Sequence, residues 1–230
     1  MDTIFQFIGK LIDMIYSYVP VYGICILFLA LLDKLLFYFN GKKYYSTIKL
    51  KEVFKPLVIK NNQKYANNPV KKTEELAKLL ASNHYPIFGG IGNLITEAIL
   101  SLVIIGIFNS PKLYLANAVS SEKMYFLFFN LTSSPASLIG STTGTETDIM
   151  ISIFLVAITL GIFIVHDKIM EDSAFTDQSF NKAVWVIFTI CFLCFNQAFT
   201  LYWFGIKIMD LIHIFIVKKF YKVTVKTNNK

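Results

Sequence analysis

Residues 23–39 read GICILFLALLDKLLFYF, an apolar run that contains one lysine, Lys34. A run of this length spans a bilayer as a helix. A charged side chain inside such a span costs roughly 2.5–3.5 kcal/mol on insertion scales. Charged residues are therefore found there mostly where they face water, a partner charge or a substrate path. This stretch predicts a membrane protein with a polar interior.

The composition agrees with a membrane protein of modest size. The chain has 230 residues, of which 55% are hydrophobic and 16% charged, whereas about a quarter of the residues of soluble domains are charged. All 22 basic residues are lysine, which lacks the planar fork of arginine. The pair Cys191 and Cys194 has the spacing of a redox or metal motif, but no second Cys/His pair follows it. We expect no metal and no cofactor.

The N-terminal part predicts a helix, a span and a polar insertion. Residues 1–20 place apolar side chains at helical spacing between polar ones, which is typical of a helix lying in the membrane interface. The first span follows at 21–39. Residues 40–86 carry ten lysines against three glutamates. Their apolar pattern and Pro69, a good first-turn residue, predict a helical hairpin.

The rest of the chain divides into spans and loops. The apolar stretch 183–217 would make a single helix of about 52 Å, which is too long for a hydrocarbon core of about 30 Å. We expect it to break at Asn196-Gln197. The predicted segments are a span at 87–108, an outer loop at 109–146, a span at 149–165, a polar loop at 166–182, and spans at 183–195 and 198–217.

Charge fixes the expected orientation. The lysine-rich hairpin should be cytoplasmic by the positive-inside tendency. Five spans then place the basic tail, residues 218–230, in the cytoplasm as well, whereas four spans would place it outside. We therefore predict an all-α membrane protein with five transmembrane helices, N-terminus out and C-terminus in, in which spans two to five occupy residues 87–217.

Several segments, taken in order, resemble one known family. They are the first span at 23–39, the hairpin segments IKLKEVFKP at 48–56 and TEELAKLL at 73–80, the outer-loop segment LFFNLTSSP at 127–135, and FTLYW at 199–203. Together they resemble the YidC/Oxa family of membrane protein insertases. The arginine of that family's groove corresponds to Lys34, and its glutamine in the second span corresponds to Thr96. The chain is thus similar to a divergent form of the minimal five-span core.

The resemblance implies a polar groove in the inner half of the bilayer, closed to the outside. Lys207 and Asp210 are three residues apart and so share one face of the last span. In the expected mechanism, a hydrated cationic groove lowers the cost of moving a polar or acidic flanking segment into the membrane. No covalent step or ATP site is expected, so the protein is not predicted to be an enzyme. The predicted groove residues are Lys34, Asn93, Thr96, Glu97, Gln197, Thr200, Lys207 and Asp210.

The basic hairpin indicates the partners. Nascent membrane proteins, anionic lipids and the ribosome are acidic or amphipathic surfaces that lysines could contact. A Sec-type translocon is a further candidate partner, and no specific DNA binding is expected. The predicted location is the inner membrane of a bacterium, as a multi-pass protein. The predicted contact residues of the hairpin are Lys49, Lys51, Lys55, Lys71 and Lys72.

Other interpretations remain open from sequence alone. The chain could be a small ion or solute transporter subunit in which Glu97, Lys207 and Asp210 form a relay, although no internal repeat is visible. It could also be a membrane scaffold without transfer activity. Lys34 could extend to the headgroups, Glu97 could be a structural partner of a lysine, and Lys207 and Asp210 could neutralise each other.

Overall fold

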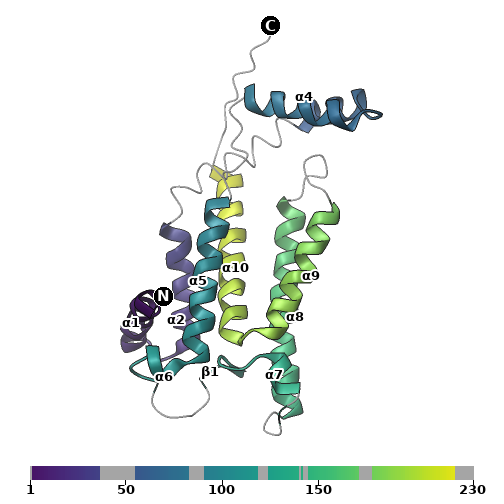
Figure 1. Cartoon of the computed structure of the whole chain (residues 1–230). Helices are drawn as coiled ribbons and strands as arrows, with labels where there is room; N and C mark the ends of the chain where they lie inside the picture. Colours follow the sequence, from purple (N-terminus) through teal and green to yellow (C-terminus); the bar gives the residue numbers. More distant parts are fainter. Residues whose placement is uncertain are drawn as a thin grey trace.

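The structure is a computed structural model that describes residues 2–36, 55–82, 91–118, 124–139, 141, 145–170 and 178–220. This part of the chain is mostly helical (Figure 1). The helices are α1 (Asp2–Tyr18), α2 (Tyr22–Leu36), α4 (Pro69–Ser82), α5 (Ile91–Asn109), α6 (Pro111–Tyr114), α7 (Pro135–Ile139), α8 (Glu146–Met170), α9 (Gln178–Cys194) and α10 (Gln197–Phe220), with a hairpin of β1 (Tyr125–Phe126) and β2 (Phe129–Asn130).

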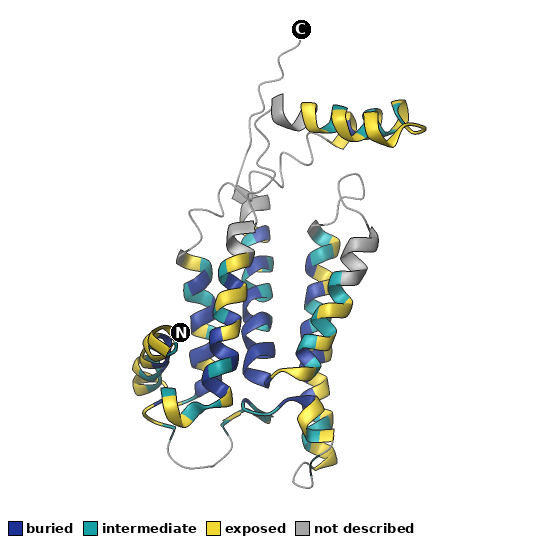
Figure 2. Ribbon diagram, viewed as in Figure 1, coloured by how far each residue is buried: buried dark blue, intermediate teal, exposed yellow. Residues whose placement is uncertain are grey.

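Helix α10 lies at the centre of the bundle and packs against α2, α5, α8 and α9. Its side chains are buried along most of its length, whereas α4 is largely exposed (Figure 2). A helix that is apolar or weakly polar on all sides is typical of a buried or membrane position. The fully buried residues Tyr202 and Ile206 of α10, Ile26 of α2 and Ile104 of α5 belong to one continuous core.

The N-terminal helix does not continue straight into the next one. Helices α1 and α2 meet at an angle of 119°, and Pro20 lies in the break between them. Ile8 and Ile12 of α1 are buried against the bundle, whereas Phe7 and Met14 are exposed. The helix expected within residues 1–20 is therefore present, and its position in a membrane interface stays a prediction.

The described residues contain two helices that are long and apolar enough to cross a membrane, Glu146–Ile169 and Gln197–Ile216. A third candidate arises if the bent pair α1 and α2 counts as one span. Ile95–Asn109 and Val184–Cys194 are apolar but shorter. The described part of the chain thus has two to three candidate spans, and the five spans and their orientation stay predictions.

The predicted outer loop, residues 109–146, contains more structure than expected. Strands β1 and β2 pair in antiparallel register, with Tyr125 opposite Asn130 and Phe126 opposite Phe129. Leu127 in the turn has a φ of 56°, in the left-handed region. This small hairpin is the departure from the all-α prediction. The sequence lacks the Asn-Gly or Gly signals that usually announce such a turn.

The segment that follows the β1–β2 hairpin has a structural role at the start of α10. Leu131 and Ser133 follow β2, and their carbonyl oxygens accept hydrogen bonds from the backbone N–H groups of Ala198 at 3.1 Å and Gln197 at 2.8 Å. The first N–H groups of a helix have no partner within the helix. The segment therefore satisfies two of them for the central helix.

The predicted break at Asn196-Gln197 is present, and one side chain explains it. Asn196 Oδ1 accepts a hydrogen bond from the Phe199 backbone N–H at 3.2 Å, which is N-cap geometry. Its Nδ2 donates to the Ile105 carbonyl at 3.1 Å and to Asn109 Oδ1 at 3.0 Å. Asn196 thus starts α10 and ties it to the end of α5.

Helix α8 is longer than the predicted span at 149–165. At its start, the Asp148 backbone N–H donates to Thr145 Oγ1, and the Thr145 N–H donates to Asp148 Oδ2, both at 3.2 Å. This is a capping box. At its end, the helix continues to Met170. The prediction of a loop at 166–182 was therefore wrong for residues 166–170, and it was also wrong for residues 178–182, which are the start of α9.

Two helical segments lie within the predicted hairpin, at residues 55–64 and at α4, with a turn between them. Asn68 Oδ1 accepts the Lys71 backbone N–H at 3.0 Å and so caps α4. Lys78 pairs with Glu74 at 2.9 Å and Glu75 at 3.0 Å, and these hydrogen bonds raise its pKa above the usual value. Residues 40–54 and 83–86 lie outside the described chain.

Substitution of Gly9 tests the packing of α1 on the bundle. A Cβ at Gly9 would overlap the carbonyl oxygen of Tyr114 in α6, so Gly9→Ala should lower the free energy of unfolding by about 1–3 kcal/mol. Gly161→Ala is the matched control, because no atom lies within 4 Å of the added Cβ. Denaturant unfolding in detergent measures both, and equal effects would contradict this packing.

Candidate functional site

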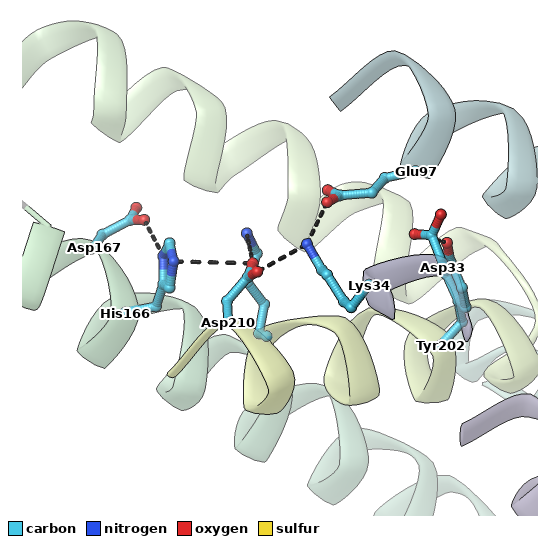
Figure 3. Close-up of polar contacts among 8 residues, drawn as sticks. Asp33, Lys34, Glu97, His166, Asp167, Tyr202 and Asp210 are labelled. Atoms are coloured by element: carbon cyan, nitrogen blue, oxygen red, sulfur yellow. Dashed lines mark hydrogen bonds and ion pairs between the residues drawn. The ribbon is translucent and has the colours of Figure 1, made fainter. Parts of the chain in front are cut away.

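The centre of the candidate site is the ammonium group of Lys34 on α2. It forms an ion pair with Glu97 Oε1 of α5 and a second one, at 2.8 Å, with Asp210 Oδ1 of α10 (Figure 3). The side chains of Lys34, Glu97 and Asp210 are 18%, 8% and 11% exposed. One lysine thus bridges carboxylates from two other helices in a largely buried position.

A second set of polar contacts extends from Asp210 toward α8. Lys207 Nζ lies 3.4 Å from Asp210 Oδ2, and His166 Nε2 lies 3.9 Å from the same oxygen. The other ring nitrogen of His166, Nδ1, lies 3.3 Å from Asp167 Oδ1. Trp185 of α9 donates its indole N–H to Asp167. We call Lys34, Glu97, His166, Asp167, Lys207 and Asp210 the charged cluster.

Asp33 lies beside the charged cluster but faces another way. Its Oδ2 accepts a hydrogen bond from the hydroxyl of Tyr202 at 3.0 Å, as Figure 3 shows. Its Oδ1 is buried and has no hydrogen-bond partner among the described residues. This contact joins α2 to the middle of α10 next to the Lys34 ion pairs.

The charged cluster lies toward one end of the bundle. Lys34 is two residues from the end of α2, Glu97 is six residues after the start of α5, and His166 is four residues before the end of α8. These ends all point toward α4 in Figure 1. Lys207 and Asp210 are three residues apart on α10, so both reach the cluster from one face of that helix.

An aromatic layer borders the charged cluster on the side away from α4. Phe188 of α9 lies 5.0 Å from Phe163 of α8 and 4.9 Å from Trp203 of α10, measured between ring centroids. Phe192 and Phe199 extend the layer, with their ring centroids 5.5 Å apart. Aromatic rings at these distances pack favourably and bury much apolar area. The layer consists of Phe163, Phe188, Phe192, Phe199 and Trp203.

Lys207 marks the boundary between the two regions. Its ammonium lies 4.9 Å from the centroid of Phe163 and 5.8 Å from that of Trp203, which is cation–π geometry. On its other side it faces Asp210. Lys207 therefore lies between the Asp210 carboxylate and the packed aromatic layer.

The structure brings four of the predicted groove residues together and separates two others. Lys34, Glu97, Lys207 and Asp210 belong to the charged cluster. Gln197 and Thr200 lie thirteen and ten residues before Asp210 on α10, which is about 20 and 15 Å along a helix. A single compact site cannot contain all six. Gln197 instead hydrogen-bonds Ser152 of α8, and the buried Thr200 hydroxyl has no partner among the described residues.

The structure describes only some of the remaining predicted residues. Thr96 precedes Glu97 on α5 and is half-buried. Asn93 is part of α5, but its side chain lies outside the described set, as do Lys49 and Lys51 as whole residues. Three of the predicted contact lysines are described: Lys55 on the segment 55–64, and Lys71 and Lys72 on α4.

Sequence reasoning missed His166, Asp167, Asp33 and Tyr202 as members of the site. The sequence predicts a loop at His166 because the apolar run ends before it. The signal that could have found it is a stripe on α8, where Ser152, Thr159 and His166 are seven residues apart and all buried. Residues at this spacing share one face of a helix, here the face that packs on α10.

The cluster is suited to ion pairing rather than to metal binding. Within the described ranges, no group of three or more His, Cys, Asp or Glu residues is arranged to hold a metal ion. Cations and carboxylates alternate instead, so that each lysine of the cluster contacts at least one carboxylate.

These features define a class of protein: a helical membrane protein with ion pairs inside its bundle at one end and apolar packing behind them. The chain belongs to the 60Kd inner membrane protein family, which includes the YidC and Oxa proteins, and residues 14–225 match that family. The family resemblance expected from the sequence is therefore confirmed. The protein is accordingly an inner-membrane protein with apolar membrane-spanning helices.

A similar protein from Treponema denticola supports this membership. It is named membrane protein insertase YidC, and the two chains are 26% identical over 110 residues. The aligned region covers 48% of this chain and 18% of the Treponema protein. The chain thus spans less than a fifth of the length of that relative, and a bacterial origin fits the match.

A double-mutant cycle on Lys34 and Glu97 tests the central ion pair. Lys34→Met, Glu97→Met and the double variant should give a coupling free energy of about 1–3 kcal/mol, because the pair is largely buried. The exposed pair Lys78 and Glu74, with side chains 62% and 59% exposed, should couple far more weakly. Denaturant unfolding provides the free energies. Equal coupling of the two pairs would contradict the burial of the Lys34 site.

Proposed function

We propose that this chain is a membrane protein insertase whose charged cluster forms the wall of a polar groove. The observation that carries the proposal is the Lys34 ammonium shared by Glu97 and Asp210 from three helices of a membrane-spanning bundle. Charges at this depth are costly and mark functional or water-filled sites. The proposed groove opens at the bundle end nearest α4.

The proposed topology has five spans, with the N-terminus outside and the C-terminus in the cytoplasm. Helices α2, α5, α8, α9 and α10 would be these spans, and α1 would lie in the outer interface. The proposed fourth span, predicted at residues 183–195, would extend only about 20 Å, less than a hydrocarbon core of about 30 Å. Short spans thin the surrounding bilayer, which would lower the barrier for a polar segment.

In the proposed mechanism, no covalent bond is formed. The polar flank of a nascent membrane protein enters the groove from the cytoplasm, where the cluster replaces part of its hydration. Its apolar segment then moves sideways into the lipid, and the free energy of partitioning drives the step. The aromatic layer supports a groove that is closed on the outer side, because the Lys207 ammonium packs directly against the rings of Phe163 and Trp203.

The proposed partners follow from charge. Nascent membrane proteins are the substrates in this proposal, and the exposed Lys55 and Lys71 of the hairpin would contact them, anionic headgroups or the ribosome. A Sec-type translocon is a further proposed partner. The hydrogen bond from Asn61 Nδ2 to the Lys72 carbonyl at 3.0 Å joins the two hairpin segments.

A second candidate function is proton or ion transport. It is favoured by the sequence of contacts from Glu97 through Lys34 and Asp210 to His166 and Asp167, since chains of titratable groups form relays in pumps. The aromatic layer argues against it, because an ion that left Lys207 on this side would meet the apolar rings of Phe163 and Trp203. Ion flux through reconstituted vesicles would favour this function over insertion.

The effect of Lys34→Ala on growth tests the proposal. In a bacterium depleted of its own insertase, the wild-type chain should restore growth and Lys34→Ala should restore little, because Glu97 and Asp210 would lose their shared cation. Lys10→Ala is the matched control, since Lys10 is exposed on α1, and it should behave as the wild type. Full growth with Lys34→Ala, at equal protein levels, would refute the groove.

A further inference from the structure

We propose that Glu97 and Asp210 set the charge selectivity of the groove by occupying the Lys34 ammonium. As a result, the chain would insert proteins with uncharged or basic polar flanks in preference to those with acidic flanks. This inference rests on the proposed insertase function and names the class of substrate that the groove accepts.

Two carboxylates of the protein already coordinate the Lys34 ammonium. An ammonium group has three N–H donors, and carboxylates of α5 and α10 both contact this one directly. A substrate carboxylate would have to displace Glu97 or Asp210, or join them around one cation. Three carboxylates around one ammonium repel each other, and the repulsion is strong where the local dielectric constant is low.

Lys207 also has partners within the protein, so it does not replace Lys34 as a free cation. Its ammonium faces Asp210 Oδ2 on one side and the rings of Phe163 and Trp203 on the other. Its side chain is 13% exposed. Each of the two lysines of the charged cluster is therefore already engaged by groups of the protein.

The positive and negative groups of the charged cluster balance one another. Two lysines and His166 face Glu97, Asp210 and Asp167, and the buried Asp33 lies beside them. With the three carboxylates of the cluster ionised, the net charge is zero even when His166 is protonated, and negative when His166 is neutral. The sequence predicts a cationic groove. The charged cluster, however, carries no net positive charge.

The groove therefore favours substrate groups that donate hydrogen bonds over substrate groups that only accept them. An ammonium or amide group entering the groove meets carboxylate oxygens, which can accept further hydrogen bonds. An entering carboxylate meets the ammonium groups of Lys34 and Lys207, both of which already have carboxylate partners. Neutral and basic flanks are therefore stabilised in the groove relative to acidic flanks of the same length.

The test uses the full chain reconstituted in vesicles of a zwitterionic phospholipid without a membrane potential. A single-span test protein carries an N-terminal tail in three versions of equal length, acidic, neutral and basic. Protection of the tail from added protease measures insertion. The wild type should insert the neutral and basic tails about tenfold better than the acidic tail, which corresponds to about 1.4 kcal/mol.

Glu97→Gln should raise insertion of the acidic tail about tenfold relative to the neutral one, because Lys34 loses one of its two carboxylates. Asp210→Asn is the second variant in case the first does not fold, and it should act in the same direction. Glu146→Gln is the matched control, since Glu146 is exposed in the first turn of α8. It should leave the ratio of the tails unchanged.

The outcomes separate this inference from the proposed function. Equal insertion of the three tails by the wild type would overturn the charge selectivity alone. A ratio of acidic to neutral insertion that neither Glu97→Gln nor Asp210→Asn changes would overturn it as well. If the wild type inserts none of the tails, the insertase function itself is refuted, and the selectivity with it.

Discussion

The structure depends on one constraint: an ammonium group inside a membrane bundle needs partners. Lys34 finds them on α5 and α10, at Glu97 and Asp210. Removing either partner from a buried pair leaves an uncompensated charge, so the three helices are held in one relative position. The other polar contacts of the site, from Lys207 to Asp167, are arranged around the Asp210 carboxylate.

The two ends of the bundle are built in different ways, and the difference suits the proposed direction of insertion. At one end, side chains from α2, α5, α8 and α10 present charges beside the basic hairpin. At the other, Asn196 and the carbonyl groups of Leu131 and Ser133 satisfy the start of α10, and the aromatic layer fills the space between. Charged side chains thus gather at one end of the bundle, whereas hydrogen bonds satisfy the backbone polar groups at the other end.

The sequence predicted the helices and part of the site for physical reasons that also explain its failures. Apolar runs predicted the helices, and the resemblance to the YidC/Oxa family, supported by the Lys207–Asp210 spacing, predicted Lys34, Glu97, Lys207 and Asp210 in one groove. Gln197 and Thr200 lie about 15–20 Å from Asp210 because α10 rises about 1.5 Å per residue, so they are outside the charged cluster, and their place in a groove stays a prediction. His166 and the contact between Asp33 and Tyr202 could not be predicted, because each depends on which helices pack together.

The most direct test of the account is water access at the charged cluster. In a chain with Cys25, Cys191 and Cys194 replaced, a membrane-impermeant maleimide is applied from either side to Lys207→Cys and to Ile212→Cys, which is exposed on another face of α10. The account predicts labelling of Lys207→Cys from the cytoplasmic side only, and little labelling of Ile212→Cys. Labelling of Lys207→Cys from the outer side, or from neither side, would contradict it.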